Sequence, residues 1–250
     1  MNIAEQETLE IEYWKNAEYE SSNNFGIYTL AHKFIEARIF LDKINEHKQS
    51  FENAKVILEV GAGQGWASCI LKKMYPQKQI YCSDISQYAL ESLKHWEEIF
   101  KVKIDKKIVC KSYEIPLENE SIDTIFCFQS AHHFRRHNET LKEVYRLLKT
   151  GGECLYLHEP SCKKYIYKLA HKRVNARRAQ VAQVAEDILI YDNIVQLAKN
   201  IGFINSKVQF APTTTNRAPF ETIYYYILQK LKFLQKLLPC TADYIFSKKV

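Results

Sequence analysis

Three glycines stand within five residues of one another in the stretch ILEVGAGQGW, at Gly61, Gly63 and Gly65. The chain has only seven glycines in all, so this clustering indicates a backbone that turns tightly or closely approaches a ligand. A dinucleotide loop of the GxGxxG type would place a glycine at Trp66, and the Gly-Lys-Ser/Thr ending of a phosphate loop is missing. The loop therefore predicts a nucleotide-like ligand without a pyrophosphate.

Asp84 lies in the stretch YCSDIS, at the end of the next apolar run and 19 residues after Gly65. A carboxylate at the end of a strand accepts hydrogen bonds from both hydroxyls of a ribose. The alternative for Asp84 is a turn or helix N-cap. A ribose beside a closely approaching backbone, with no pyrophosphate, is the description of S-adenosylmethionine.

Histidines follow two further strand-like runs. His132 and His133 come after TIFCF, and an imidazole there is a candidate general base near neutral pH. The alternative is a structural role in holding the loop. His158 and Glu159 end the next run and are candidates to contact the substrate, although Glu159 is equally suited to capping the helix that we expect after it.

The elements that must position these residues alternate between strand and helix. We expect strands at 55–60, 79–83, 107–110, 124–128 and 153–157, and helices at 65–74, 87–100 and 139–148, with Ser86 as an N-cap and Gly151-Gly152 as a C-cap signal. Two late strands are expected at 207–210 and 244–247, with a helix at 192–201 before them. This alternation predicts a doubly wound, parallel α/β sheet whose site lies beyond the carboxyl ends of the strands.

Four stretches carry a resemblance to a known family: ILEVGAGQGW, YCSDIS, IPLENESIDTIFCFQSAHHF and LKEVYRLLKTGGECLYLHEP. In this order they resemble the class I S-adenosylmethionine-dependent methyltransferases, above all the small-molecule branch that includes the ubiquinone and menaquinone biosynthesis enzymes. The resemblance covers residues 52–160 well. It implies a Rossmann-like sheet of seven strands with the last strand antiparallel, S-adenosyl-L-methionine as cofactor, and S-adenosyl-L-homocysteine as its product.

The resemblance also implies roles for single residues. Glu59, Gly61, Ala62, Gly63 and Gly65 would shape the methionine and ribose side of the pocket, Asp84 would hold the ribose, and Ile85 would pack on the adenine. Lys111 stands where the family has an acid at the adenine edge, so Ser112 or Tyr113 would supply that contact. Gln129 would lie near the methionine part of the cofactor.

The segments that flank the core are expected to cover the pocket. Residues 1–50 would form a helical lid, to which Tyr13, Trp14, Tyr19, Tyr28 and Trp66 are candidates to contribute, with core packing as the alternative. Tyr19 is also a candidate to contact the substrate. Residues 51–160 would bind the cofactor, 161–190 would form a basic helical cap, and 191–250 would complete the sheet, with an aromatic helical insert at 222–238.

The cap holds most of the unusual charge of the chain. Seven Lys or Arg and no acid lie between Cys162 and Ala185, and Lys164, Lys168 and Lys172 would share one helix face. They are candidates to attract an acidic acceptor, and a solvated face is the alternative. The insert at 222–238 is aromatic, apolar and basic, which suits core packing, a dimer face or a membrane surface with a lipid-like acceptor.

Composition bounds the remaining possibilities. With 46% apolar and 26% charged residues, no apolar leader and no apolar run long enough to span a bilayer, we expect a cytoplasmic globular protein, monomeric or homodimeric. The seven cysteines form no CxxC pair, so neither a metal site nor a disulfide framework is expected. A catalytically silent binding module on the same fold remains an alternative. A nucleic-acid methyltransferase ranks lower, because Gln129-Ser130-Ala131-His132 replaces the Asn/Asp-Pro-Pro-aromatic motif.

Overall fold

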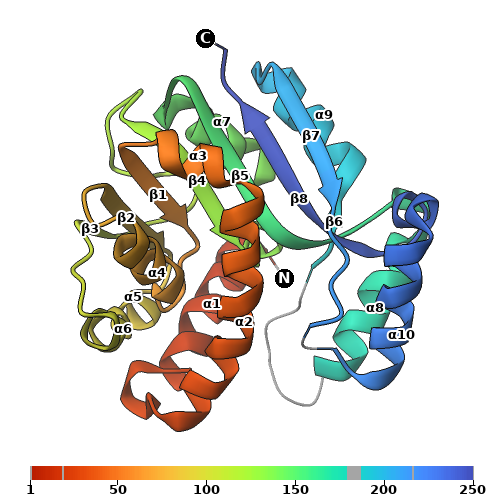
Figure 1. Cartoon of the computed structure of the whole chain (residues 1–250), viewed down its shortest axis with the longest axis horizontal. Helices are drawn as coiled ribbons and strands as arrows, with labels where there is room; N and C mark the ends of the chain where they lie inside the picture. Colours follow the sequence, from red (N-terminus) through yellow and green to blue (C-terminus); the bar gives the residue numbers. More distant parts are fainter. Residues whose placement is uncertain (1, 19, 179–186, 216, 250) are drawn as a thin grey trace.

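A computed structural model describes residues 2–18, 20–178, 187–215 and 217–249. Its centre is a sheet with the strand order β3-β2-β1-β4-β5-β8-β7 (Figure 1). The strands are β1 (Val56–Val60), β2 (Gln79–Asp84), β3 (Lys106–Val109), β4 (Ile122–Phe128), β5 (Leu148–Cys162), β7 (Asn205–Phe210) and β8 (Cys240–Ser247). Along this order, the strands β3, β2, β1, β4 and β5 are parallel to one another. Strand β8 is antiparallel to both of its neighbours, β5 and β7. The predicted doubly wound sheet with an antiparallel last strand is confirmed.

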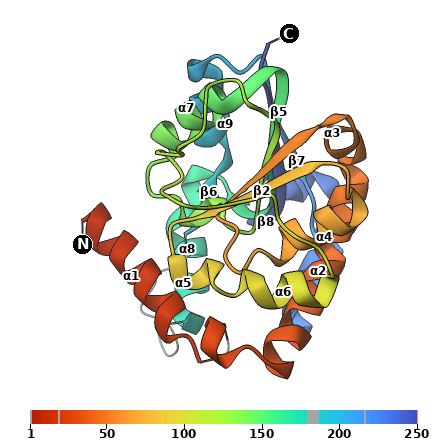
Figure 2. The same ribbon diagram turned by 90° about the vertical axis from the view of Figure 1, so that its left-hand side faces the viewer.

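Helices cover both faces of this sheet because neighbouring strand residues point to opposite sides. Ile57 packs with α2 (Ile27–Glu46), α3 (Lys48–Asn53), α4 (Trp66–Met74) and α6 (Leu93–Phe100). Leu58, the next residue, packs with α7 (His137–Leu147) and α9 (Tyr191–Ile201) on the other face. Figure 2 shows the sheet nearly on edge between these two layers. The short α5 (Gln87–Leu90) precedes α6.

Two predicted helices differ in detail from the structure. The helix expected at 87–100 is interrupted at Glu91 and Ser92, so α5 and α6 are separate, although the Ser86 hydroxyl caps α5 as predicted by accepting from the Ala89 amide. The helix expected to end at Gly151-Gly152 ends at Leu147, because Leu148 already pairs with Ile122 of β4. The two glycines lie inside β5 instead.

Strand β5 is much longer than expected. The strand was expected to end at residue 157, but Pro160 pairs with Thr241 and Ser161 pairs with Cys240 of β8. A register shift between Tyr156 and Glu159 interrupts this pairing, and it includes Leu157 and His158. A two-residue strand, β6 (Leu189–Ile190), also pairs with β5, so the described residues form a sheet of eight strands, where seven were expected.

The flanking segments lie at one end of the sheet. Helix α1 (Ile3–Asn16) and the start of α2 lie on one side, and α8 (Tyr167–Arg178) and α10 (Pro219–Lys230) lie side by side on the other (Figure 1). The expected single insert at 222–238 is divided, because α10 ends at Lys230 and a 3-10 turn, η4 (Lys232–Lys236), follows it. Within the described ranges, no helix combines the length and the apolar character needed to cross a membrane.

Candidate active site

The glycine loop connects β1 to α4 and adopts a backbone that few other residues tolerate. Gly61 has φ 69° and Gly65 has φ 77°, in the left-handed region. A Cβ atom at Gly61 would lie 2.8 Å from the Ser130 Oγ atom, and one at Gly65 would lie 2.7 Å from Leu93 Cδ1. Both positions therefore require glycine, for conformation and for space. The loop borders a cavity of about 1540 Å³ at the carboxyl ends of the strands.

Asp84 joins the end of β2 to this loop. Its Oδ2 atom accepts from the Gly63 amide at 2.7 Å, and its Oδ1 atom accepts from the Ser86 amide at 2.8 Å. Burial raises the pKa of Asp84 to about 6, against the opposing effect of the Ser86 and Gly63 amides. Asp84 and the neighbouring Ile85 both line the cavity. The carboxylate is thus held by the backbone in a fixed orientation beside the loop.

Glu59 ties the same loop to the first turn of α4. Its Oε2 atom accepts from the Ser68 amide at 3.0 Å and from the Ser68 hydroxyl at 2.5 Å. Burial raises the pKa of Glu59 to about 8, and the nearby Asp84 carboxylate acts in the same direction. Glu59 and the buried Ala62 both border the cavity. Glu59 therefore acts first as a positioning residue for the loop and the helix.

Helix α1 supplies a carboxylate at the place where Lys111 replaces the expected acid. Glu7 accepts from the Tyr113 hydroxyl at 2.6 Å and pairs with the Lys111 ammonium at 3.0 Å. The Ser112 hydroxyl is 2.8 Å from the Thr140 hydroxyl of α7. Ser112 and Tyr113 both line the cavity, as does Glu7. The contribution of Glu7 had no signal in the sequence, because it lies more than a hundred residues from its partners.

The remaining lid aromatics behave differently from one another. Trp14 lies over the loop, since a Cβ atom at Gly63 would be 3.3 Å from its ring. Trp66 is buried and contacts the Phe40 and Phe128 rings edge to face, so it packs in the core, and it also borders the cavity. Tyr13 donates to Glu20 and Tyr28 is exposed at the cavity rim. Tyr19 lies outside the described residues.

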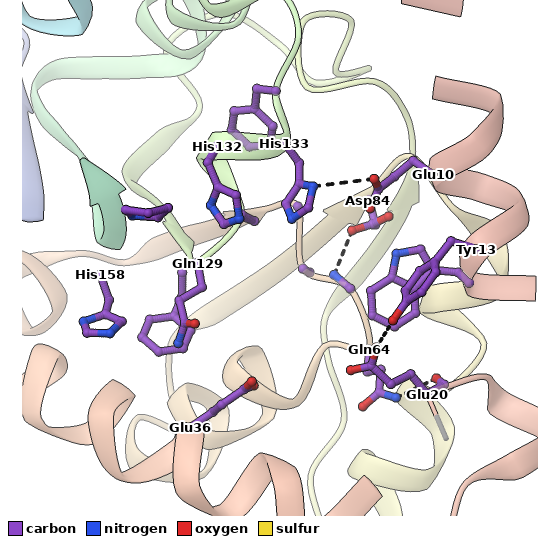
Figure 3. Close-up of a pocket in the computed structure, with 18 of the residues that line it drawn as sticks. Glu10, Tyr13, Glu20, Glu36, Gln64, Asp84, Gln129, His132, His133 and His158 are labelled. Carbon is purple, nitrogen blue, oxygen red and sulfur yellow. Dashed lines mark hydrogen bonds and ion pairs between the residues drawn. The ribbon is translucent and has the colours of Figure 1, made fainter. Parts of the chain in front are cut away.

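The two histidines after β4 are both engaged. His132 Nδ1 is 2.7 Å from Oε2 of Glu159, and Glu159 also accepts from the amides of Ser130, Ala131 and His132. Although burial opposes it, these bonds hold the pKa of Glu159 below its usual range. His133 Nδ1 lies 3.6 Å from Oε2 of Glu10 in α1. His132 and His133 both line the cavity (Figure 3).

Glu159 itself does not reach the cavity, which corrects the expectation that it contacts substrate. It is fully buried, and its oxygens are occupied by His132 and by the backbone after β4. The alternative role for Glu159, as the cap of a helix, is closer to the structure, because its carboxylate accepts backbone amides. However, the amides that it caps belong to the turn that precedes α7, not to a helix after β5.

His158 is the polar group of β5 that does face the cavity. It is 4% exposed, its Nδ1 atom has no hydrogen-bond partner among the described residues, and its ring stacks on Phe128. Burial, followed by the Arg217 guanidinium, lowers the pKa of His158 to about 4, so the ring is neutral near pH 7. His158 has φ 58° and Gln129 has φ 51°, a strained backbone at two adjoining cavity residues (Figure 3).

Asp243 of β8 fixes the backbone of His158 from behind. It is fully buried and accepts from the His158 amide at 2.8 Å, the Lys43 ammonium at 3.0 Å and the His47 ring at 3.2 Å. Glu46, His47 and Asp243 also have the spacing of metal ligands. The Lys43 ammonium lies 2.6 Å from Glu46 and 3.0 Å from Asp243, so this side chain already supplies the positive charge between the two carboxylates.

The far end of the cavity is lined by arginines and tyrosines of the cap. Arg173 of α8 lies over the Tyr224 ring, 5.7 Å from its centroid, and 4.0 Å from Glu221. Arg217 stacks on the Tyr225 ring at 4.0 Å and donates to the Thr213 carbonyl, and it forms no ion pair within the described ranges. Arg135, which precedes α7 and is not part of the cap, also lines the cavity and lies 3.8 Å from Asp187.

The predicted lysines do not contribute to this end, which is a second correction. Lys164, Lys168 and Lys172 are exposed and do not line the cavity. Lys164 lies in a 3-10 turn, η3 (Lys164–Ile166), before α8, so the three do not share one helix. The cavity face of α8 is Ala170, Arg173 and Val174. The solvated-face alternative therefore describes the lysines, while residues 179–186 of the expected cap lie outside the described part.

Comparisons with known proteins agree with this architecture. Residues 58–156 match a family described as a methyltransferase domain. A methyltransferase-like protein of Schizosaccharomyces pombe is 32% identical over 41% of this chain and 37% of its own length. A ubiquinone/menaquinone biosynthesis C-methyltransferase of Desulfotalea psychrophila is 28% identical over 44% of each chain. This chain thus matches less than half the length of these relatives.

A solved structure extends the likeness to nearly the whole chain. Phosphoethanolamine N-methyltransferase 2 of Haemonchus contortus, in complex with S-adenosyl-L-methionine, aligns with a TM-score of 0.63. The alignment covers 96% of this chain and 60% of that one at 15% identity, which is a likeness of fold. Residues 58–156 therefore form a methyltransferase domain, and the fold around it is similar to that of a methyltransferase in complex with S-adenosyl-L-methionine.

Proposed function

We propose that this protein transfers the methyl group of S-adenosylmethionine to a small anionic acceptor bound under the cap. The observation that carries the proposal is a single cavity with two chemically different ends. One end is lined by the glycine loop and Asp84, and the other by His158 and the cap arginines. Its volume of about 1540 Å³ exceeds the roughly 300–1,000 Å³ of an ordinary small-molecule site, which leaves room for cofactor and acceptor together.

The cofactor would occupy the loop end. Asp84 would accept the ribose hydroxyls, and Ile85 would pack on the adenine. Ser112, Tyr113 and Glu7 border the place proposed for the adenine edge. Gln129 stands between this end and His158, where the methionine part would lie (Figure 3). Glu59 and the glycines would act through the shape of the loop.

The acceptor would occupy the cap end because its charge and its open bonding positions are there. Arg217 makes no ion pair among the described residues, and His158 offers a buried ring nitrogen without a partner. A carboxylate or phosphate on the acceptor would satisfy the guanidinium, since such pairs form strong, charge-assisted hydrogen bonds. Arg173 and Arg135 would add to the positive potential at this end.

The chemistry requires alignment more than side-chain participation. The cofactor supplies a sulfonium methyl group, which an acceptor lone pair displaces in line, and S-adenosylhomocysteine is released. The walls of the cavity would hold the two molecules in register and exclude water. If the acceptor atom carries a proton, His132 is the base candidate with the best support, because Glu159 can stabilise its protonated ring.

The segments of the chain divide these tasks. Residues 1–50 would close over the cofactor, and residues 51–160 would bind it. Residues 161–190, together with the insert at 222–238 within 191–250, would surround the acceptor. The inner side of α10 supports this division, because Tyr224 and Tyr225 line the cavity.

Labelled S-adenosylmethionine and a fractionated metabolite extract test the proposal. Label is expected in products that bind an anion-exchange resin, and Arg217→Gln should raise the KM for the active fraction about tenfold while leaving affinity for S-adenosylhomocysteine unchanged. Arg38→Gln is the matched control, because Arg38 is exposed on α2. Label found only in neutral or cationic products would overturn the anionic acceptor. Tight cofactor binding without transfer would identify a silent binding module, and label in RNA or DNA would identify a nucleic-acid methyltransferase.

A further inference from the structure

The outer surface of the cap is built from four elements that lie against one another: η3, α8, α10 and η4. The Tyr165 hydroxyl of η3 donates to the Leu237 carbonyl that follows η4, and Arg173 of α8 approaches Glu221 of α10. Figure 1 shows α8 and α10 side by side at the edge of the molecule. We call the solvent-exposed side of these four elements the cap face.

The cap face exposes an unusual number of large apolar side chains. Phe220 is 86% exposed, Tyr165 is 68%, Leu169 is 67% and Phe233 is 63%, and Ile223 and Tyr226 are more than half exposed. The core does not need these residues, because α10 uses a different side, with Tyr224, Tyr225 and the buried Leu228, to face the cavity and the core. Several large apolar side chains exposed on neighbouring elements indicate an interaction site.

Exposed positive charge lies along the same elements. Six lysines of the cap face are exposed: Lys164, Lys168, Lys172, Lys230, Lys232 and Lys236. Among the described residues of these four elements the one acid is Glu221, which lines the cavity and approaches Arg173. The cap face therefore combines apolar side chains with a single sign of charge.

We infer that the cap face docks onto an anionic lipid surface, with its aromatic side chains among the acyl chains and its lysines at the headgroups. Amphipathic helices that lie in a membrane interface have this combination of bulky apolar residues and lysines. A second copy of this chain fits less well, because a twofold interface places the same patch on both partners and would oppose lysine to lysine. The charge thus favours an anionic surface over self-association.

This inference does not rest on the proposed methyl transfer, but the two would meet in α10. Its outer side carries Phe220, Ile223 and Tyr226, and its inner side carries Tyr224 and Tyr225, which line the cavity. Docking would therefore place a wall of the acceptor site one helix diameter from the lipid surface. An acidic amphiphile could then reach the cavity without crossing bulk water.

Vesicle sedimentation tests the inference with the full chain and no cofactor. Vesicles of phosphatidylcholine with 30% phosphatidylglycerol are expected to bind the protein at least tenfold more strongly than phosphatidylcholine alone, and added salt should weaken binding. Changing Lys230, Lys232 and Lys236 to Gln should lower the partition coefficient by about 100-fold, at about fivefold for each lysine. Equal binding to both kinds of vesicle, or none, would overturn the inference.

Two controls separate the cap face from bulk charge and from folding. Changing Lys94, Lys101 and Lys107 to Gln removes the same charge from exposed positions on and after α6 and on β3, and should change partitioning less than threefold. Phe220→Ser with Phe233→Ser should reduce binding at least tenfold, whereas Ile99→Ser should not. Unchanged thermal unfolding verifies each fold. A dimer in sedimentation equilibrium that the two Phe changes dissociate would assign the surface to a second copy instead.

Discussion

The two ends of the cavity differ in how far their polar side chains are already bonded. At the cofactor end, both oxygens of Asp84 accept backbone amides, and Ser68 donates twice to Glu59. At the cap end, His158 has a buried nitrogen without a partner, and Arg217 rests on a tyrosine ring without an ion pair in the described part of the chain. The polar groups of the cofactor end are thus held in place by internal hydrogen bonds, and each Asp84 oxygen keeps an acceptor site for a ligand, while the cap end has polar groups that lack a hydrogen-bond or ion-pair partner.

This difference indicates which part of the site is general and which is specific. Backbone amides and glycines build the cofactor end, so its geometry follows from the strand–loop–helix connection itself. Apart from Arg135, the charged side chains named at the cap end lie on segments outside the matched domain at 58–156. A buried polar group without a partner costs about 1–3 kcal/mol, and an acceptor that bonds to His158 would recover part of that cost.

The largest expected effect tests the cofactor end. Asp84→Ala should lower affinity for S-adenosylhomocysteine by about 100-fold, because two charge-assisted hydrogen bonds from ribose are lost. Isothermal titration calorimetry measures this directly. Asp42→Ala, at an exposed position on α2, is the control and should have no effect. Full affinity in Asp84→Ala would remove the ribose assignment.

Acid should weaken the same end more gradually. The ionised form of Asp84 is the better acceptor for ribose hydroxyls, and its pKa is about 6. Affinity for S-adenosylhomocysteine should therefore be retained at pH 7 and should fall on acidification, approaching about tenfold per pH unit below pH 6. A series of binding titrations from pH 7 to pH 5 tests this. In the Asp84→Asn variant, which has no carboxyl group at this position, the affinity should not depend on pH over this range. An identical pH profile in both proteins would assign the titration to another group.

A change at the cap end should have opposite effects on stability and turnover. His158→Phe removes a buried nitrogen without a partner and keeps a ring on Phe128, so the free energy of unfolding should rise by about 1 kcal/mol. Turnover of the acceptor fraction should fall about tenfold, with affinity for S-adenosylhomocysteine unchanged. Thermal denaturation and labelled-methyl assays measure the two effects. A parallel loss of stability and turnover would indicate that His158 serves the fold alone.

The smallest effect should come from the lysines on the outer face of the cap. Changing Lys164, Lys168 and Lys172 together to Gln should leave the KM for a water-soluble acceptor within twofold, because none of them lines the cavity. The comparison with Arg217→Gln in the same assay distinguishes charge inside the cavity from charge outside it. A KM raised as far as in Arg217→Gln would bring the lysines back into the acceptor site.

The sequence predicted the sheet and the loop end because both depend on local patterns. Gly61 and Gly65 are required by a positive φ and by neighbours that leave no space for a Cβ atom, and clustered glycines report such conditions directly. Asp84 is the last residue of β2, as expected from the position of the apolar run. The strand ends were less accurate, since β5 continues past Pro160 through its pairing with β8.

The cap end was not predicted, because contacts between distant segments decide it. The spacing of Lys164, Lys168 and Lys172 implied one shared face, but η3 interrupts the helix and Arg173 occupies its inner side. Arg217 and Tyr225 gave no signal that they line the same cavity as His158, which lies about sixty residues earlier in the chain. Glu159 had the right position along its strand, but its bonds to the loop after β4 turn it away from the cavity.

Helix α1 has no buried residue, and polar contacts from Glu7 and Glu10 contribute to its attachment over the loop. Its detachment would expose side chains that are only partly buried, so the free energy of opening should be smaller than that of global unfolding. Amide hydrogens of α1 should accordingly exchange with solvent far faster than those of β1. The rate at which α1 detaches would then limit the release of S-adenosylhomocysteine. Because ionic contacts help to hold α1, higher ionic strength should accelerate this release.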